Sequence, residues 1–592
     1  MTAGDELAVA SGTPHTEETE APQAPTKTRR GLSRSERGIS LVTLIILVVV
    51  PLAFVVVAAF ITGAPLPGIG TDWSFTLEHI GVMLGSMGMW TAMWNSFVLA
   101  LGSTIFGVAL GVFLAWLAAR TDVPMRGLVT FTAIVPLLIP GLVGAIAWTF
   151  LAAPGTGYIS LLIEQLGLPV QPNIYTMGGM LFVMTLYNVS VPFILTYGAL
   201  QMTNPDMEDA ANVHGATSWR TMFGITLPLV KPALLSAIIL TFVSTMEEFP
   251  VPMILGYSNG IETMAARIFV LTGQAPPPVN ENSAQAVLLM AVVLILVIMQ
   301  RRMVKNQSFA SVTGKGVRHR VVKLGWFRWV GFAIAMLYVF LAVGLPLLAL
   351  LMGSLRTSLF VRDFSDLMDT SKMSLAPLTR ALESPALWDA VRNSTLVALA
   401  VAIVGVLVSL LIAHASSGRD TWASRLIRRL AMLPAAAPAV VMGLGFVWAY
   451  VILPVSIYGT LIILIVAIVA RLIPVSSSAL SDAMGGIHHE LEEAAGVSGA
   501  TRWQSVWWVT APLLRTTMIS TGLMLFVMAT REISMSIFLY TPSNMTFAVY
   551  LYTLWSDGTW ASLASMSFIF AMLTMAFVIV AQRWLTTTPT EH

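Results

Sequence analysis

Two polar segments that lie 284 positions apart carry the same residue types at the same spacing. Each has a glutamate, two alanines and a glycine: Glu208, Ala210, Ala211 and Gly215 in the first, and Glu492, Ala494, Ala495 and Gly499 in the second. Carboxylates favour the first turn of a helix, and a glycine ends a helix or lets another backbone come close. The pattern therefore predicts two helix–Gly–helix hairpins whose chemistry is docking into a groove of a partner protein.

The residues around the first copy support this hairpin. Asn204 followed by Pro205 favours a helix start, and Thr217 is placed to cap a second short helix. Pro228 then marks the start of the next apolar segment. Because the two copies agree better than most of the apolar segments beside them, we expect both to serve the same task. The alternative is an ordinary loop that was duplicated with its neighbours.

Three glutamates at the ends of apolar runs form a second set of candidates: Glu247, Glu248 and Glu532. Glu248 and Glu532 are also 284 positions apart, so we expect them to face each other across a pseudo-two-fold axis. Ionisable groups are costly in lipid and usually face a pathway or a partner. They either line a translocation pathway or its outer gate and favour a cationic substrate, or they fix helix packing. Arg531 beside Glu532 favours the packing role for that copy.

The composition defines the surroundings of these residues. Of 592 residues, 56% are hydrophobic and 10% are charged, whereas soluble domains have roughly 25% charged residues. The net charge of +2 gives no indication of nucleic-acid binding. The absence of cysteine excludes disulfides, iron–sulfur clusters and thiolate zinc sites. The chain is therefore predicted to be a membrane protein.

Apolar runs long enough to cross a bilayer recur along the chain and must position the candidate residues. Six fall in the first half, near 39–62, 91–119, 127–152, 176–202, 226–257 and 284–302. Six fall in the second half, near 326–354, 393–416, 430–453, 456–479, 510–540 and 560–582. We predict an all-α polytopic membrane protein with about 12 transmembrane helices in two parallel six-helix repeats. Prolines inside or beside these runs predict kinked helices.

The basic residues predict the orientation, because cytoplasmic loops are rich in Lys and Arg. The basic segments are separated by even numbers of apolar runs: the N-terminal tail, 120–126, 220–231, 301–323, 419–429 and 502–515. All of them, and both docking hairpins, are therefore expected in the cytoplasm together with the N- and C-termini. Since each half has an even number of runs, the halves share one orientation. The predicted location is the bacterial cell membrane.

The same patterns predict the domain organisation. The expected parts are a disordered cytoplasmic tail at 1–38, a first repeat at 39–303, a basic cytoplasmic linker at 304–325, a second repeat at 326–585 and a tail at 586–592. The N-terminal part is rich in Thr, Glu, Pro and Ala before it becomes basic, which is typical of a disordered tail that holds the first helix in place.

The two docking segments resemble the cytoplasmic EAA loops of the permeases of bacterial ATP-binding cassette (ABC) importers. In that family the loop is a coupling helix that docks on the nucleotide-binding subunit, and the fold is the type I permease fold. The resemblance, which covers about residues 40–585, implies that Glu208–Gly215 and Glu492–Gly499 each hold one of two copies of an ATPase. It also implies an extracytoplasmic substrate-binding protein as a further partner.

The chain itself lacks the residues for ATP chemistry. Its one Gly-Lys pair, Gly314-Lys315, is followed by Gly316 instead of Ser or Thr, so it does not match a phosphate-binding loop. ATP-Mg is therefore expected on a separate ATPase, and this chain is expected to be a transporter subunit without a catalytic site or a cofactor of its own. We expect no metal site either, because His489 has Glu493 where a zinc motif needs a second histidine.

The fused six-plus-six arrangement resembles the ferric iron and thiamine type of these permeases, close to the polyamine and phosphonate importers. The segments that carry this resemblance are Val312–Gly316, Glu248–Gly256 and Arg531–Tyr540. Ferric iron is the first expectation for the substrate, and thiamine, polyamine and phosphonate are alternatives. A proton-coupled secondary transporter is also compatible with twelve helices in two parallel six-helix repeats, but it does not require two coupling loops.

Overall fold

The computed structural model describes residues 34–64, 72–202, 210–211, 213–305, 321–357, 361–417, 421–453, 457–486, 491, 494–495 and 497–587. Most of the predicted linker and the greater part of the predicted N-terminal tail lie outside these residues. Within them, the regular elements are helices, and β-pairing is limited to isolated bridges such as Thr121–Val322.

The first half of the chain contains α1 to α15. Their bounds are α1 Arg34–Leu44, α2 Val50–Ala59, α3 Glu78–Gly85, α4 Met87–Arg120, α5 Arg126–Ile134, α6 Gly141–Ala152, α7 Tyr158–Gln165, α8 Met177–Asn188, α9 Ser190–Met202, α11 Ser218–Thr221, α12 Leu227–Leu229, α13 Lys231–Met246, α14 Met264–Thr272 and α15 Val279–Lys305.

The second half contains α16 to α30. Their bounds are α16 Phe327–Val339, α17 Leu345–Leu355, α18 Phe364–Met368, α19 Ala376–Glu383, α20 Pro385–Ser416, α21 Trp422–Ala431, α22 Ala439–Ile452, α23 Leu461–Gly485, α25 Arg502–Ser505, α26 Ala511–Leu513, α27 Arg515–Thr530, α28 Ser536–Leu539, α29 Phe547–Ser556 and α30 Trp560–Thr587.

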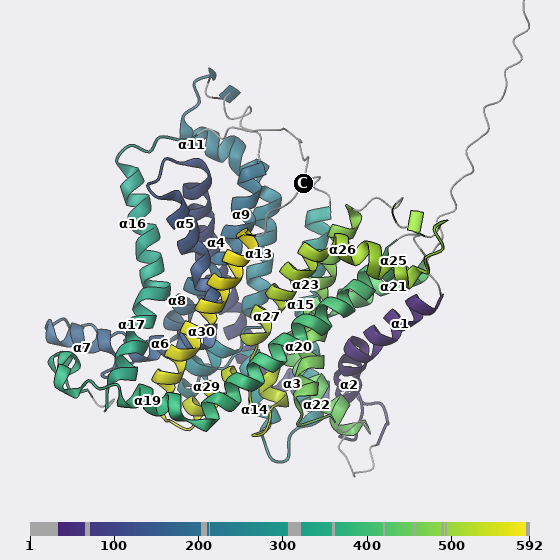
Figure 1. The fold of residues 1–592 in the computed structure, drawn as a ribbon. Helices are drawn as coiled ribbons and strands as arrows, with labels where there is room; N and C mark the ends of the chain where they lie inside the picture. Colours follow the sequence, from purple (N-terminus) through teal and green to yellow (C-terminus); the bar gives the residue numbers. More distant parts are fainter. Residues whose placement is uncertain are drawn as a thin grey trace, which may run out of the picture.

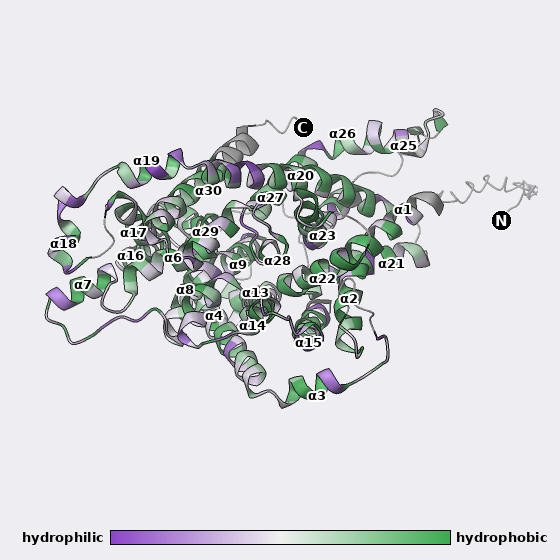
Figure 2. Cartoon of the chain, turned by 90° about the horizontal axis from the view of Figure 1, so that it is seen from below, coloured by the Kyte–Doolittle hydropathy of each residue, from purple (hydrophilic) through white to green (hydrophobic). Residues whose placement is uncertain are grey.

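Every predicted apolar run corresponds to a helical segment of the described chain. Eight helices are long and apolar enough to span a membrane, and two further runs are helix pairs with a sharp bend. The remaining two runs are the shorter apolar helices α13 and α22. The prediction of an all-helical membrane fold with two repeats is confirmed. Figure 2 shows the apolar character of the long helices and the more polar outer segments around α3, α7 and α18.

Prolines break the third run of each repeat, as expected. In the first repeat, α5 continues into a 3-10 turn at Val135–Leu138, and α6 then leaves at 95°. In the second repeat, α21 is followed by the equivalent turn at Leu433–Ala436 and by α22. Both turns have proline at their second residue, and another proline, Pro140 or Pro438, precedes the next helix. Proline ends the hydrogen-bond ladder, so carbonyl groups are left without helical partners there.

The fifth run of each repeat is shorter than predicted. The expected segment 226–257 contains α13, which begins at Lys231 and ends at Met246, and Pro228 lies before a bend at Val230. In the second repeat, the segments on either side of Leu514 form an angle of 73°. The sequence is apolar on both sides of each bend, so hydropathy does not reveal where the helix changes direction.

The first helices of each repeat pack on the other repeat. Helices α1 and α2 contact α21 and α22, whereas α16 and α17 contact the equivalent α5 and α6. At the closest point, a Cβ atom added to Gly445 of α22 would lie 2.5 Å from the backbone oxygen of Pro51 in α2. This exchange of helices interlocks the two repeats.

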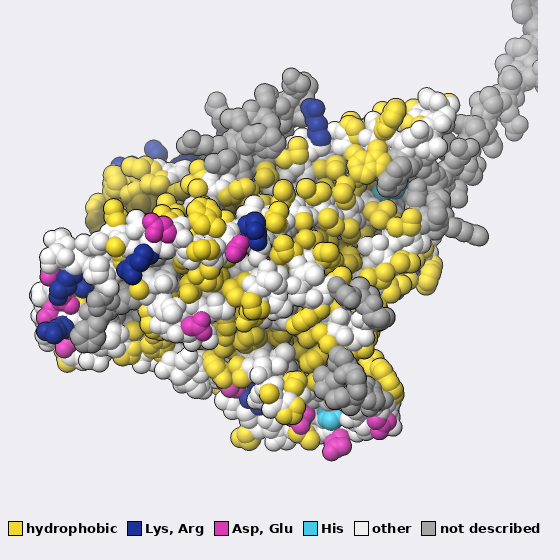
Figure 3. Space-filling view, turned by 60° about the horizontal axis from the view of Figure 1, so that its bottom comes forward, with side chains coloured by type: hydrophobic (Ala, Val, Ile, Leu, Met, Phe, Trp, Pro, Cys, Tyr) yellow, Lys and Arg dark blue, Asp and Glu magenta, His cyan; other side chains and the backbone are white. Residues whose placement is uncertain are grey.

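The two ends of the helical bundle carry different connections (Figure 1). The segments around α11 and α25 lie toward one end, and α3, α7 and α19 lie toward the opposite end. Helices α11 and α25 follow the two predicted docking segments, Glu208–Gly215 and Glu492–Gly499, which we call the docking loops. Figure 3, in which the end with α3, α7 and α19 comes forward, shows many hydrophobic side chains, with charged ones gathered at the left edge and on the lower lobe. The long helices themselves are apolar, as membrane-spanning helices must be.

We expect Gly445→Ala to destabilise the protein by about 1–3 kcal/mol, because the new methyl group forces α2 and α22 apart. Gly198→Ala is the matched control: Gly198 is inside α9, and a Cβ there meets no atom within 4 Å. The control should keep or raise stability, since alanine is the better helix former. Thermal unfolding of the detergent-purified chain measures both, and a G445A protein as stable as the wild type would contradict the interlocked packing.

Candidate coupling loops and charged turns

The two docking loops have the same local geometry where the structure describes them. The Ala216 N–H donates to the Ala211 carbonyl at 3.0 Å, and the Ala500 N–H donates to the Ala495 carbonyl at 3.0 Å. Gly215 and Gly499 precede these donors with φ of +79° and +87°. A bond that spans five residues with a left-handed glycine before the donor is the Schellman end of a helix. Glycine is needed here for its positive φ, because a Cβ at either position would meet no atom within 4 Å.

Small and apolar residues of these loops are exposed. Ala210 and Ala494 are exposed, and Ala211 and Ala495 are partly exposed. In the part of the chain that the structure describes, Val213 and its counterpart Val497 are the most exposed large apolar residues, at 86% and 90%. Apolar side chains at such exposure suit a partner surface. The remaining two predicted loop residues, Glu208 and Glu492, lie outside the described residues.

A second short helix follows each glycine, as predicted from Thr217. The Arg220 N–H donates to the Thr217 hydroxyl at 3.4 Å. In the second repeat the cap is reciprocal: the Gln504 N–H donates to the Thr501 hydroxyl at 3.4 Å, and the Thr501 N–H donates to the Gln504 side-chain oxygen at 2.8 Å. The chain then passes the bends at Val230 and Leu514 and continues into α13 and α27.

A short charged segment, which we call the charged turn, follows the C-terminal end of α13 and of α27. The residue after α13 is Glu247 and the residue after α27 is Arg531, and these two positions are again 284 apart. Glu248 and Glu532 follow them. Each docking loop is therefore joined to a charged turn by a short helix, a bend and then one long helix, α13 in the first repeat and α27 in the second.

Arg471 of α23 connects the two repeats. Its guanidinium donates to the Glu247 carboxylate at 2.5 Å, and both side chains are largely buried, with exposures of 20% and 16%. The same guanidinium donates to the carbonyl groups of Pro434 and Ala437 at 3.0 and 2.8 Å. These carbonyls belong to the proline-broken turn before α22. Arg471 thus satisfies the broken helix of its own repeat and pairs with a carboxylate of the other.

Arg531 does the same across the interface. Its guanidinium donates to the Leu137 carbonyl in the broken turn of the first repeat, and it lies within electrostatic reach of Glu248. The Glu248 carboxylate is 3.5 Å from where a Cβ on Gly141 would stand, at the start of α6. A carboxylate at the N-terminus of a helix interacts favourably with the helix dipole.

Glu532 has a local partner set. Its carboxylate accepts from the backbone N–H groups of Met535 and Ser536 at 2.8 and 3.0 Å and from the Ser536 hydroxyl at 2.8 Å. It therefore orders the turn that begins α28. Within the described residues, no contact joins Glu248 to Glu532. The Arg531 guanidinium bonds to the first repeat instead of to its neighbour Glu532.

The sequence prediction selected Glu247, Glu248 and Glu532 but missed Arg471. The missed signal is simple, because Arg471 is the only charged residue between Leu461 and Val475 in an otherwise apolar run. A charged group in such a run normally has a specific partner. Which partner it has depends on the packing of α23 against the first repeat, which hydropathy does not show.

Paired Asn and Ser residues fix two further helices in equivalent ways. Asn95 donates to the Glu262 carbonyl at 2.8 Å, and Ser96 accepts from the Met264 N–H at 2.9 Å at the start of α14. In the second repeat, Asn393 donates to the Met545 carbonyl at 3.1 Å. Ser394 there accepts from the Phe547 N–H at the start of α29. The second run of each repeat thus holds the helix beside the charged turns.

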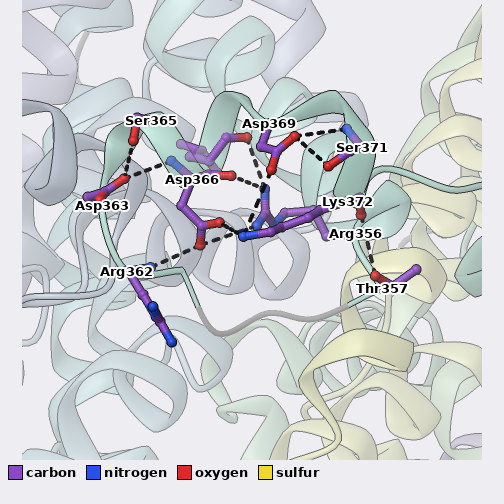
Figure 4. Close-up of polar contacts among 10 residues, drawn as sticks. Arg356, Thr357, Arg362, Asp363, Ser365, Asp366, Asp369, Ser371 and Lys372 are labelled. Atoms are coloured by element: carbon purple, nitrogen blue, oxygen red, sulfur yellow. Dashed lines mark hydrogen bonds and ion pairs between the residues drawn. The ribbon is translucent and has the colours of Figure 1, made fainter.

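The segment between α17 and α19, toward the end of the bundle away from the docking loops (Figure 1), forms an ordered cluster of polar contacts (Figure 4). Arg356 is fully buried, and its guanidinium donates to the carbonyls of Asp366 and Leu367 at 3.0 and 2.9 Å. A hydrogen bond from Lys372 and another from the Arg362 N–H lower the pKa of Asp366. The buried guanidinium holds a surface of mixed acidic and basic side chains in one shape.

The fold and these sites define the class of the protein. Two interlocked helical repeats, each with an exposed loop at one end and a charged turn inside, form a polytopic membrane permease. A family model described as "Binding-protein-dependent transport system inner membrane component" matches residues 107–302 and 405–587. The chain belongs to this family, and the model matches it twice. It is therefore an importer permease, a multi-pass inner-membrane transporter subunit.

Named relatives agree with this membership. The chain is 24% identical over 522 residues to "Ferric transport system permease protein FbpB" of Actinobacillus pleuropneumoniae, covering 86% of this chain and 73% of the relative. It is 24% identical to "Putative ferric transport system permease protein FbpB 1" of Haemophilus influenzae, covering 76% of this chain and 69% of the relative. A solved bacterial alginate ABC transporter aligns at 19% identity and a TM-score of 0.36, over 40% of this chain and 85% of that chain.

We expect Glu247→Gln to destabilise the protein by about 2 kcal/mol, because it leaves the Arg471 charge without its partner; partial exposure keeps the loss below that of a fully buried pair. Arg471→Met removes the donors for two carbonyls as well and should cost at least as much. The double variant should lose less than the sum, and a double-mutant cycle by thermal unfolding measures the coupling.

Asp389→Asn is the control for this cycle. Asp389 pairs with Arg392 at 3.2 Å on the surface of α20, where both side chains are more than half exposed. Its loss should change stability by less than about 0.5 kcal/mol. If the stability losses of Glu247→Gln and Arg471→Met were strictly additive, this would contradict a pairing that holds the repeats together.

Proposed function

We propose that this chain forms the complete translocation pathway of a binding-protein-dependent ABC importer and that its cargo is ferric iron. The observation that carries the mechanism is the pair of docking loops, which share a glycine-ended helix and an exposed valine in both repeats. Two equivalent loops in one chain require two equivalent partners. We assign these to two copies of an ATPase that binds ATP-Mg, because this chain has no phosphate-binding loop.

The loops lie in the cytoplasm in this proposal, together with both termini. The excess of Lys and Arg in the segments next to them supports this orientation. The opposite end of the bundle then faces outward and receives the substrate-binding protein. The cluster held by Arg356 supports this assignment, since an ordered polar surface gives a binding protein a fixed shape to recognise.

The path from ATPase to substrate runs along α13 and α27. When two ATPases close on each other, they move the docking loops, and each loop is connected through a short bent segment to the helix that ends next to Glu247 or Arg531. These residues bond to the other repeat, at Arg471 and at the Leu137 carbonyl. Movement of either helix must therefore rearrange the inter-repeat bonds, and this rearrangement opens and closes the pathway.

The cargo assignment is supported by the relatives and by the charged turns. The two ferric transport permeases named above align over most of this chain. Carboxylate oxygens are suitable transient ligands for a hard cation, and Glu248 is the turn carboxylate for which neither a cap nor a short ion pair is described. Thiamine, polyamine and phosphonate import by the same mechanism are the alternatives, and the binding protein decides among them.

We expect Gly215→Val and Gly499→Val to reduce transport by more than tenfold, because a β-branched residue does not adopt the positive φ of these positions. Asparagine tolerates this conformation, so Gly215→Asn is the matched control and should retain most of the activity. Substrate-stimulated ATP hydrolysis by the reconstituted complex measures coupling directly. Equal activity of the Val and Asn variants would exclude a role for the glycine-ended helix.

We expect proteoliposomes containing the chain, its ATPase and its binding protein to take up labelled ferric iron only when ATP is present. Labelled thiamine, polyamine and phosphonate are tested in the same vesicles. Uptake that persists without ATP and stops with a protonophore would identify a proton-coupled transporter instead. ATP-dependent uptake of another solute would support the importer mechanism but contradict the assignment of ferric iron as the cargo.

A further inference from the structure

A groove of about 740 Å³ opens between α13 and α15. Its lining includes four apolar residues and two basic ones: Leu235, Ile295, Ile298, Met299, Lys231 and Arg302. Ile295 is 64% exposed, and Ile298 and Met299 are also exposed. Exposed apolar side chains in a groove between membrane-spanning helices suit the acyl chains of a lipid.

The charges lie at one end of this groove. Lys231 is the first residue of α13, and Arg302 is near the last residue of α15, which runs in the opposite direction. Ile295 is seven residues from Arg302, or about 10 Å along the helix. The groove therefore has two cationic side chains at the membrane surface and an apolar floor that reaches into the hydrocarbon region.

Neither cation has a protein partner among the described contacts. Both side chains are exposed, and within the described part of the chain no ion pair involves Lys231 or Arg302. Two unpaired cations next to an apolar groove complement a ligand that has a negative head and a long apolar tail. Basic pockets between transmembrane helices bind the anionic head groups of lipids.

We propose that this groove binds one anionic glycerophospholipid. The phosphate lies between Lys231 and Arg302, and the acyl chains follow Leu235, Ile295 and Ile298. The orientation in the proposed function places this lipid in the cytoplasmic leaflet. Binding itself does not depend on transport, so a failure of the cargo assignment leaves this site untouched.

The position of the site gives the lipid a role in coupling. Lys231 directly follows the bend at Val230, and this bend joins the first docking loop to α13. A phosphate held by Lys231 and Arg302 fixes the start of α13 against α15. The lipid therefore stabilises the joint through which movement of the docking loop reaches Glu247.

The test uses the full-length chain purified in detergent and titrated with phosphatidylglycerol, with binding read by native mass spectrometry. Wild-type protein should retain one phosphatidylglycerol more tightly than phosphatidylethanolamine with the same acyl chains. Lys231→Gln with Arg302→Gln should weaken this binding by about 25-fold, from about fivefold for each basic residue. Ile298→Trp should also displace the lipid, because it fills the groove without a change of charge.

Arg301→Gln is the matched control, because Arg301 is an exposed neighbour on the same helix that does not line the groove. It should leave the affinity within about twofold, since its distance from the head group removes most of the attraction. Thermal unfolding of each variant confirms that it is folded. Equal affinity for the two lipids, or an equal loss in the R301Q and double variants, would overturn the site.

Discussion

A backbone carbonyl released from a helix inside a membrane must find a donor within the protein, because lipid offers none. This constraint governs the centre of the molecule. Prolines break the third helical run of each repeat, and the freed carbonyls of Leu137, Pro434 and Ala437 accept hydrogen bonds from arginines. An arginine at such a depth needs a counter-charge in turn, and Glu247 supplies one from the other repeat. The same few hydrogen bonds and ion pairs therefore provide donors for the freed carbonyl groups and join the two repeats.

The duplication has kept the helices and changed the charges. Thr176 and Thr460, at equivalent positions, cap equivalent helices. In contrast, Arg471 stands where the first repeat has Tyr187, and Arg531 stands where it has Glu247. In a symmetric pair of identical halves, both copies of a position would make the same contact. In this fused chain, Glu247 pairs with Arg471, whereas its counterpart Arg531 donates to the Leu137 carbonyl of the other repeat.

The interlocked first helices limit how the two repeats can move around the contact between Glu247 and Arg471. Since α1 and α2 pack on the second repeat and α16 and α17 pack on the first, separation of the halves would have to break both sets of contacts. Relative movement is then restricted to shifts of elements such as α13 and α27, which join the docking loops to the charged turns. A lipid held beside the bend at Val230 would act on the same joint.

The sequence by itself determined the membrane class, the twelve apolar runs, the duplication and the proline breaks, because hydropathy and proline act locally along the chain. It also placed the docking glycines, since a left-handed helix end is a local requirement. Only the tertiary structure decided the bends at Val230 and Leu514, the different surroundings of Glu248 and Glu532 and the role of Arg471. These depend on which helices of the two repeats meet, and a charge inside an apolar run does not specify its partner until distant segments pack together.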